Sequence, residues 1–185
     1  SDDEVVLAVI GRLVEAKGHR YLFEALSRLN GAYKVKLLVV GDGPLLSSLK
    51  SIVRSRKLEK KVIFTGLRRD IPSLLGAIDI VVMPSLREGL PIVALEAMCH
   101  GVPIVETNVG GTAEVVEDNK TGVLVSSQNP EALSRAIEKL LKNKELRENM
   151  GKDGARRVKE LFSLDKMVTQ TQELYEECLR AKAKR

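Results

Sequence analysis

The sequence predicts an α/β domain in which a parallel sheet of about six strands is covered by helices on both faces. Two observations support this prediction. Up to Val125, short apolar runs alternate with longer segments of helical periodicity. Most of the short runs are apolar at nearly every position, which is typical of parallel strands buried on both sides. The pattern therefore favours a doubly wound, Rossmann-like sheet, followed by a helical C-terminal end.

The expected strands follow one another along the chain at intervals that leave room for helices. They are Val5–Ile10, Val35–Val40, Val62–Thr65, Ile80–Met83, Pro103–Glu106 and Gly122–Val125. The helices expected between them are His19–Leu29, Pro44–Arg56, Ile71–Ala77, Pro91–His100 and Thr112–Glu117. Because each helix separates two strands of one sheet, the strands should all be parallel.

The last part of the chain carries helical periodicity without strands, over Pro130–Leu141, Glu145–Glu160 and Leu164–Ala183. Pro130 suits the first turn of a helix, where its missing N–H is not needed. Ser163 can cap the last helix, but Lys166 at the third position rules out a capping box. No internal repeat or low-complexity linker is visible, so residues 1–185 are expected to form a single domain.

Composition limits the classes of function. Of the 185 residues, 44% are hydrophobic, which is enough to bury a substantial core. Aromatic residues make up 3% and Trp is absent, so stacking platforms for single-stranded nucleic acid are scarce. The net charge of +5 suits an anionic small ligand or an acidic membrane surface and does not require nucleic acid.

The two cysteines, Cys99 and Cys178, lie far apart and lack neighbours at metal-ligand spacing. We expect them to be structural thiols in a reducing cytosol, which predicts a cytoplasmic protein and no metal site. No signal peptide and no continuous apolar stretch of membrane-spanning length is present. A strand that starts as early as Val5 is expected of a piece cut from a longer protein.

Ligands of open parallel sheets bind beyond the carboxyl ends of the strands, so the loops there are the places to look for chemistry. The first such loop, GRLVEAKG, contains Arg12 and Lys17 ahead of a helix. A guanidinium and an ammonium near a helix N-terminus suit two phosphates. The alternative, two solvated cations on a surface loop, is equally compatible with the spacing.

The second loop, VVGDGPLL, contains Gly41 and Gly43 after a strand. A complete dinucleotide fingerprint would need a glycine or alanine where Leu46 stands, and no acidic residue follows at the expected distance. We interpret this loop as a tight turn into a helix whose first turn contains Pro44, and we predict no NAD.

The stretch SLREGLPIVALEAM places Glu88 before a helix start and Glu96 inside an apolar run. With Pro91 in the first turn, the amides of Ile92 and Val93 are free to hold a phosphate. Five residues of helix separate Pro91 from Glu96, roughly 7–8 Å along the axis. We interpret the stretch as a nucleotide-sugar site, with the ribose at Glu96, the diphosphate at the helix start and the sugar at Glu88. The alternative for Glu96 is a peripheral helix face with a salt bridge.

Gly110 and Gly111, in the stretch TNVGGTAE, precede another short helix. A pair of glycines there is compatible with a close approach of the backbone to a ligand. It is equally compatible with a sharp turn.

Taken in order, GRLVEAKG, VVGDGP, VIFTG, PSLREGLPIVALEAMCHGVPIV and GGTAEVVEDNKTG closely resemble the C-terminal domain of family-four retaining glycosyltransferases, also called glycosyltransferase group 1. The likeness covers the chain from Val5 to about Tyr175, and the ordered set is specific although no single element is. It implies the donor-binding half of a two-domain GT-B enzyme, with the N-terminal acceptor domain absent from residues 1–185.

The resemblance implies a role for each matching residue. Arg12 and Lys17 would contact the donor diphosphate, and Glu88, which opens the E-x7-E motif, would bind hydroxyls of the donor sugar. Glu96 closes the motif and would bind the ribose. The other donor-binding positions are Gly89, Leu90, Ile92, Val93, Gly110, Gly111 and, around the base, Gly66 and Arg68, with Asp70 as a reader of a guanine edge.

The resemblance also implies the reaction, which is the retaining transfer of a hexosyl group from a UDP- or GDP-sugar to an acceptor hydroxyl. No cofactor, metal or nucleic acid is expected. His19 and His100 are interpreted as structural, so no general base is named and the domain alone should lack turnover. In such enzymes the last helix often returns to the N-terminal domain, and a lipid-linked acceptor would bring the protein to the inner face of the membrane.

Two other readings remain at this point. One is a non-catalytic module that binds nucleotide-sugars. The other is a different enzyme of the same fold, such as a sugar-nucleotide epimerase or a phosphorylase. A phosphorylase would need a lysine environment for pyridoxal phosphate, which the sequence does not show.

Overall fold

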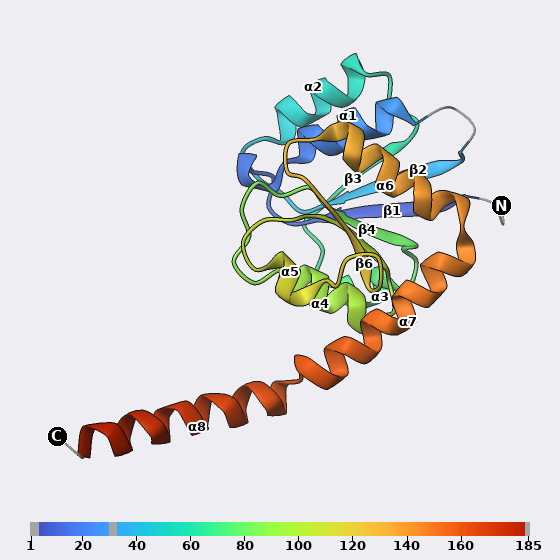
Figure 1. Ribbon diagram of the computed structural model, residues 1–185. Helices are drawn as coiled ribbons and strands as arrows, with labels where there is room; N and C mark the ends of the chain where they lie inside the picture. Colours follow the sequence, from blue (N-terminus) through green and yellow to red (C-terminus); the bar gives the residue numbers. More distant parts are fainter. Residues whose placement is uncertain (1–3, 30–32, 184–185) are drawn as a thin grey trace.

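The computed structural model describes residues 4–29 and 33–183, and it confirms the predicted α/β fold. Six parallel strands form one sheet in the order β3-β2-β1-β4-β5-β6. Helices cover both faces of this sheet (Figure 1). The strands are β1 Val5–Ile10, β2 Val35–Val40, β3 Val62–Gly66, β4 Ile80–Met83, β5 Ile104–Thr107 and β6 Gly122–Val125.

The strand order places β1 and β4 side by side in the middle of the sheet. From β1 the chain moves outward to β2 and β3, then returns to the other side of β1 and continues outward through β5 and β6. The two loops that leave β1 and β4 therefore diverge to opposite sides. Doubly wound folds bind their ligands in the crevice that this reversal opens.

Each face of the sheet has its own apolar core, because alternate residues of a strand point to opposite sides. Leu7 and Val9 of β1 belong to one core, while Ala8 and Ile10 belong to the other. The first core is covered by α1 His19–Arg28, α2 Leu46–Ser55 and α6 Pro130–Lys142. The second is covered by α3 Ile71–Leu75, α4 Ile92–Cys99, α5 Thr112–Val115 and α7 Lys144–Leu161.

Most element boundaries agree with the sequence prediction within two residues, and three of the differences lie at prolines. Strand β5 begins at Ile104 rather than at Pro103, because a proline has no N–H to donate to a neighbouring strand. Helix α2 begins at Leu46, since Pro44 lies in a turn that the Leu46 amide closes on the carbonyl of Gly43. Helix α4 begins at Ile92, with Pro91 as the residue just before it.

Side chains cap the helices of the C-terminal part. Asn129 accepts a hydrogen bond from the amide of Ala132 at 2.9 Å and so starts α6, with Pro130 in the first turn as predicted. Asn143, which the sequence analysis did not consider, caps α7 in the same way. The hydroxyl of Ser163 accepts from the amide of Lys166 at 3.3 Å, so the predicted cap of the last helix is present.

The last helix, α8 Leu164–Ala183, projects away from the body of the domain (Figure 1). Its apolar side chains recur at the three- and four-residue spacing of one helix face and are all exposed. They are Leu164, Met167, Val168, Leu174, Tyr175 and Leu179. Within residues 4–29 and 33–183, no helix combines the length and the apolar character needed to cross a membrane.

Candidate functional site

The predicted site residues lie at or after the carboxyl ends of four strands, β1, β3, β4 and β5. Because all strands are parallel, these segments meet at one edge of the sheet. A short helical turn, η1 Glu15–Lys17, follows β1 and includes Lys17. Glu88 lies in the loop after β4, Gly66 to Asp70 follow β3, and Gly110 and Gly111 follow β5.

Glycines allow these loops to pack directly against one another. A Cβ atom at Gly110 would lie 1.7 Å from the carbonyl oxygen of Glu88, and one at Gly111 would lie 2.4 Å from that of Gly89. The Gly111 amide also donates to the Gly89 carbonyl at 3.1 Å. The close approach made by this glycine pair is therefore to the backbone that carries Glu88. The pair determines where Glu88 stands, whatever ligand it also meets.

Glycines also allow the loops that follow other neighbouring strands to pack closely together. A Cβ at Gly18 would lie 1.9 Å from the carbonyl oxygen of Pro84, which ties the loop after β1 to the loop after β4. A Cβ at Gly41 would lie 2.0 Å from the carbonyl oxygen of Gly11, and Gly41 has a φ of 131°. Loop packing thus accounts for Gly41, the first glycine of VVGDGP, in agreement with the tight turn predicted there.

The side chains of three loop residues meet at one oxygen atom. The ammonium of Lys17 donates to Oε1 of Glu88 at 2.6 Å, and the hydroxyl of Ser85 donates to the same oxygen at 2.7 Å. The side chain of Glu88 is 9% exposed and that of Lys17 is 30% exposed. Within the described part of the chain, no group binds Oε2 of Glu88. One carboxylate oxygen is therefore held in place while the other is available.

Ser85 and Thr107 support this arrangement, and sequence reasoning missed both. Ser85 is buried, and its carbonyl oxygen accepts a hydrogen bond from the hydroxyl of Thr107 at 2.5 Å. Thr107 ends β5, so a side chain of the neighbouring strand fixes the start of the loop that carries Glu88. The signal for Ser85 in the sequence was a small hydroxyl residue just after an expected strand, between Pro84 and Glu88.

The free amides at the start of α4 are not the pair that the sequence predicts. The Ile92 amide donates to the carbonyl of Leu90 at 3.0 Å, because the chain makes a tight turn at Pro91. The amides of Leu90 and Val93 make no hydrogen bond to the described residues. Two amides therefore remain free near this helix start, but Ile92 is not one of them.

Glu96 is exposed, whereas its apolar sequence neighbours suggest burial. Ala94, Ala97 and Met98 form the face of α4 that packs on the sheet, and Glu96 projects from another face. Its carboxylate makes no hydrogen bond or ion pair within the described chain, so the alternative of a peripheral salt bridge is not realised either. The side chain is free to meet a ligand from solvent.

The remaining predicted polar residues are also at the surface. Arg12 is exposed, and its guanidinium contacts no acidic group of residues 4–29 and 33–183. Arg68 instead pairs with Asp70 through two hydrogen bonds, of 2.8 and 2.5 Å. These bonds lower the pKa of Asp70 below its usual value. Gly66, before this pair, has a φ of 71° and accepts the Gly41 amide at 2.9 Å.

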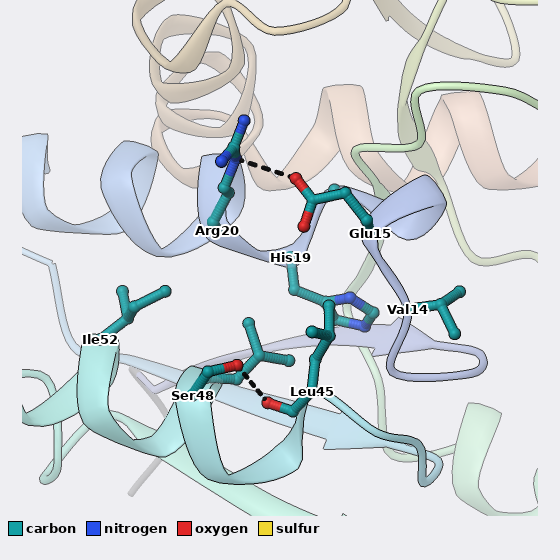
Figure 2. A pocket seen from close by; sticks show the side chains of 9 residues that line it. Val14, Glu15, His19, Arg20, Leu45, Ser48 and Ile52 are labelled. Carbon is teal, nitrogen blue, oxygen red and sulfur yellow. Dashed lines mark hydrogen bonds and ion pairs between the residues drawn. The ribbon is translucent and has the colours of Figure 1, made fainter.

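The site is an open surface rather than an enclosed pocket. The cavity beside Lys17 and Glu88 has a volume of only about 10 Å³, which is about the least that holds one water molecule. A larger cavity of about 130 Å³ lies on the far side of the loop after β1, between that loop and α2 (Figure 2). A ligand the size of a nucleotide must therefore lie on the loops, with one side uncovered by the described residues.

His19 projects toward Val14 and Leu45 beside that larger cavity (Figure 2). It is 2% exposed, and neither ring nitrogen has a hydrogen-bond partner among the described residues. Burial, followed by the charge of Lys17, lowers the pKa of His19 to about 4. The ring is therefore neutral near pH 7, which agrees with the structural role predicted for it.

Glu106 is a buried acid that sequence reasoning did not consider. It lies in β5, is 0% exposed, and neither carboxyl oxygen has a partner in the described chain. Burial and then the negative charge of Glu88 raise the pKa of Glu106 to about 8, while Lys17 opposes this rise. An acidic residue near the end of an apolar strand was the signal that could have found it.

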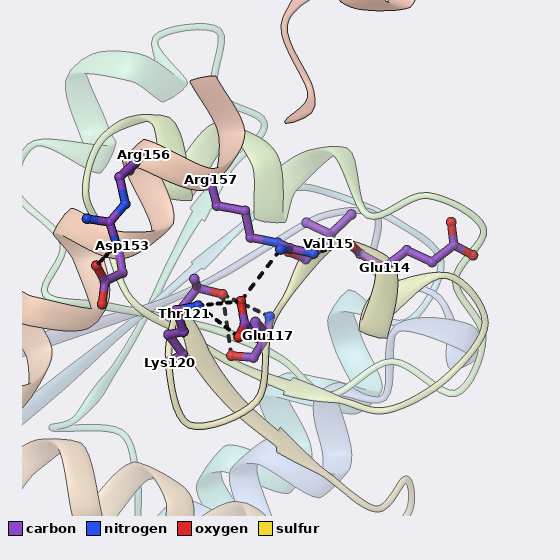
Figure 3. A network of polar contacts seen from close by, with 8 residues as sticks. All are labelled: Glu114, Val115, Glu117, Lys120, Thr121, Asp153, Arg156 and Arg157. Carbon is purple, nitrogen blue, oxygen red and sulfur yellow. Dashed lines mark hydrogen bonds and ion pairs between the residues drawn. The ribbon is translucent and has the colours of Figure 1, made fainter. Parts of the chain in front are cut away.

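Arg157 of α7 holds the segment that follows the glycine pair (Figure 3). Its guanidinium donates to the carbonyl oxygens of Val115 and Glu114, each at 2.8 Å, and lies 3.6 Å from Oε2 of Glu117. These carbonyls belong to the end of α5, where helix carbonyls lack partners. Helix α7 thus stabilises the end of α5, the short helix that follows the glycine pair.

The positions of the His, Cys, Asp and Glu side chains bear on metal binding. In residues 4–29 and 33–183 no three His, Cys, Asp or Glu side chains gather closely enough to hold a metal ion. Cys99 and Cys178 are free and exposed, so neither contributes to the core as a structural thiol would.

Comparisons with known proteins agree on one family. The chain is 32% identical over 180 residues to the N-acetyl-alpha-D-glucosaminyl L-malate synthase of Bacillus anthracis, covering 97% of this chain and 47% of that protein. It is 32% identical to the alpha-D-kanosaminyltransferase of Streptomyces kanamyceticus, covering 95% of this chain and 46% of that protein. The chain thus spans about half the length of the curated relatives it matches.

Solved structures confirm the fold. The chain matches Anabaena Alr3699/HepE, solved in complex with UDP and glucose, with a TM-score of 0.89 and 26% identity over 95% of this chain and 49% of that one. The family model of glycosyl transferases group 1 matches residues 1–157. The Rossmann-like sheet, the loop sequences and these matches lead to one conclusion: the chain belongs to the glycosyltransferase group 1 family and has the fold of a GT-B domain.

Proposed function

We propose that this domain binds a UDP- or GDP-sugar and presents it for retaining transfer of the sugar to an acceptor hydroxyl. The observation that carries the proposal is the state of Glu88. Lys17 and Ser85 hold its Oε1, and Oε2 has no hydrogen-bond partner in the described chain. A carboxylate oxygen fixed in this way is pre-organised to accept a hydrogen bond from a sugar hydroxyl.

The donor diphosphate would lie between Arg12, Lys17 and the start of α4. An ammonium has three N–H groups, and Lys17 uses one of them on Glu88. Its remaining donors, the unpaired guanidinium of Arg12 and the free amides of Leu90 and Val93 would meet the phosphate oxygens. In this proposal the protein itself provides the positive charge that the diphosphate needs.

The nucleoside would extend from the diphosphate toward two exposed regions. The free carboxylate of Glu96 suits the vicinal hydroxyls of a ribose, which is how ribose is recognised at other nucleotide sites. The loop with Gly66 and Arg68 would border the base. Because Arg68 is paired with Asp70, a base that contacts either residue would have to compete with that pair.

The reaction would break the bond between the anomeric carbon and the diphosphate and form one to the acceptor oxygen on the same face. The acceptor proton would pass to the departing phosphate oxygen. Arg12, Lys17 and the start of α4 would stabilise the negative charge that develops there, which is the largest contribution such a site makes. Glu88 would hold the sugar hydroxyls while this happens.

A second domain would complete the site. Binding sites normally bury most of a ligand's surface, but here the cavity beside Lys17 and Glu88 measures only about 10 Å³. We propose that residues 1–185 are the C-terminal half of a GT-B enzyme and that an N-terminal half closes over the donor and binds the acceptor. The exposed apolar face of α8 is suited to packing against that half.

Calorimetric titration of the 185-residue chain with UDP-, GDP- and ADP-sugars tests donor binding directly. We expect one of them to bind and expect Glu88→Gln to weaken it about tenfold or more, because a hydrogen bond to a charged group is lost. Glu145→Gln, an exposed change on α7, is the matched control. A folded chain that binds none of the three would contradict the proposal.

A non-catalytic module that binds nucleotide-sugars is the second candidate, since the cavity beside Lys17 and Glu88 measures only about 10 Å³ and leaves a bound donor largely uncovered. Turnover of the full-length protein, compared with its Glu88→Ala variant, separates the two functions. A transferase should lose most of its turnover in the variant. Unchanged turnover would instead support the module.

The proposed location is the cytoplasm, because the exposed cysteines of the described chain are unpaired thiols, as in a reducing compartment. The net charge of +5 also suits a lipid-linked acceptor at an anionic membrane surface. Co-sedimentation of the full-length protein with anionic and neutral vesicles would test this part of the proposal.

A further inference from the structure

A second carboxyl group lies close to the Lys17–Glu88 pair without a partner of its own. Glu106 is the third residue of β5 and faces the same side of the sheet as Ile104, the side covered by α3, α4, α5 and α7. Its neighbour across the sheet is Met83, after which the loop to Glu88 begins. Both of its oxygens are buried and lack a partner in the described chain, a place where an ionised carboxylate is strongly disfavoured.

The charges around Glu106 do not balance if both carboxyl groups are ionised. The charged groups that act on it are Glu88 and Lys17. Helix α3 carries no charged side chain, α4 adds only the exposed Glu96, and α5 adds only the exposed Glu114. Arg157 of α7 donates instead to the carbonyl oxygens of Val115 and Glu114. One ammonium therefore serves two carboxyl groups. Since Lys17 and Ser85 both donate to Glu88, Glu88 is the charged member and Glu106 the neutral one.

We propose that Glu106 is a positioning residue for the donor site: as a neutral acid it leaves Lys17 to Glu88, and when ionised it competes for Lys17 and releases Glu88. The effect on donor binding rests on the function proposed above, because it assumes that Glu88 holds the donor sugar. The competition between the two carboxyl groups for Lys17 does not depend on that assumption.

The expected consequence is a loss of donor affinity in mildly alkaline solution. Burial and the charge of Glu88 keep the pKa of Glu106 near 8, so ionisation begins just above neutral pH. If the ionised form does not hold the donor, affinity falls about tenfold for each pH unit above that pKa.

The test compares wild type, Glu106→Gln and Glu145→Gln by calorimetry with UDP-glucose from pH 6.5 to 9. Glutamine has the shape of the neutral acid and does not ionise, so Glu106→Gln should bind as wild type does at pH 6.5 and keep that affinity at pH 9. Wild type and Glu145→Gln should weaken by about tenfold between pH 6.5 and pH 9. An identical alkaline loss in Glu106→Gln would overturn the proposal.

A carboxyl-carbon NMR titration of the same chain separates this inference from the proposed function. The signal that disappears in Glu106→Gln should titrate well above the usual range of a glutamate, and the Lys17 ammonium signal should move with it. A Glu106 signal that titrates near 4.5, or a Lys17 signal that does not follow it, overturns the inference even if the donor binds. Failure of UDP-glucose to bind at every pH, with both signals titrating together, counts against UDP-glucose as the donor and supports the coupling.

Discussion

The loop after β4 and helix α4 carry the two glutamates of one short motif, but they hold them in opposite ways. Glu88 is almost buried, and its Oε1 binds a lysine and a serine. Glu96 stands exposed on the helix, and its carboxylate makes no hydrogen bond or ion pair within the described residues. The difference arises because the loop is enclosed by other loops, whereas α4 buries only the face that packs on the sheet.

This contrast shows that two glutamates of one motif can differ in how firmly the protein holds their side chains. Glu88 is pre-organised, so a ligand that binds it loses little entropy in ordering the side chain. Glu96 must be ordered by the ligand itself, which costs part of the interaction. We therefore expect the loop to contribute more to specificity than the helix does, and the following changes test that difference.

The largest effect should come from disrupting the contact between Gly110 and the loop that carries Glu88. In Gly110→Ala a Cβ would lie 1.7 Å from the carbonyl oxygen of Glu88, at a residue whose φ is 55°, so the loop must move. We expect affinity for the donor sugar to fall by about 100-fold, the effect of a misplacement of about 1 Å.

Gly76→Ala is the matched control for that change, since its Cβ would meet only the carbonyl oxygen of Ser73 at 3.4 Å. Calorimetry on both variants gives the comparison. Equal affinities of the two variants would show that the contact between Gly110 and Glu88 does not position the site.

An intermediate effect should distinguish the two glutamates. Glu88→Gln removes the charge that pairs with Lys17 and Ser85, so it should lower both donor affinity and the melting temperature. Glu96→Gln should lower affinity by less, about fivefold to tenfold, and leave the melting temperature unchanged because the side chain has no partner to lose. Calorimetry and thermal unfolding of the same samples measure both quantities. A melting temperature lowered equally in both variants would remove the distinction.

The change with the smallest expected effect on binding concerns His19, which lies beneath the loop that carries Lys17. Its effect should appear in stability as the pH is lowered. The folded state keeps the pKa of His19 at about 4, below its ordinary 6.5. Between these values the unfolded chain binds the additional proton, so stability falls as the pH drops from 6.5 towards 4. The loss should be on the order of 1–3 kcal/mol.

His19→Leu should remove that part of the acid loss while leaving affinity near pH 7 within about twofold, because leucine fills a similar volume. Urea unfolding of wild type and variant at pH 4.5 and pH 7 provides the measurement. Parallel acid losses in the two proteins would mean that other groups cause the decline.

Much of the fold could be predicted because it depends on local patterns. Strands that are apolar at successive positions and helices with a three- to four-residue repeat identify themselves without reference to the rest of the chain. Several of the boundary errors lie at proline residues, where the missing N–H delays β5 to Ile104 and a turn delays α2 to Leu46. The carboxyl-edge loops could also be identified, since parallel strands bring them together.

The environment of each site residue could not be predicted in the same way. The exposed position of Glu96 depends on which face of α4 packs on the sheet. The capture of the Ile92 amide by Leu90 depends on the turn at Pro91. Neither fact can be inferred from the spacing of residues along the chain.

The sequence by itself determined the α/β fold, the edge of the sheet where the site lies, and the candidate residues in its loops. Only the tertiary structure decided which of the acids are paired. Lys17 and Glu88 are 71 positions apart in the chain and meet at 2.6 Å, while Glu106, closer to Glu88 in sequence, has no partner within the described residues. The physical reason is that pairing and burial depend on distances in space between side chains of different strands and loops, which no local pattern specifies.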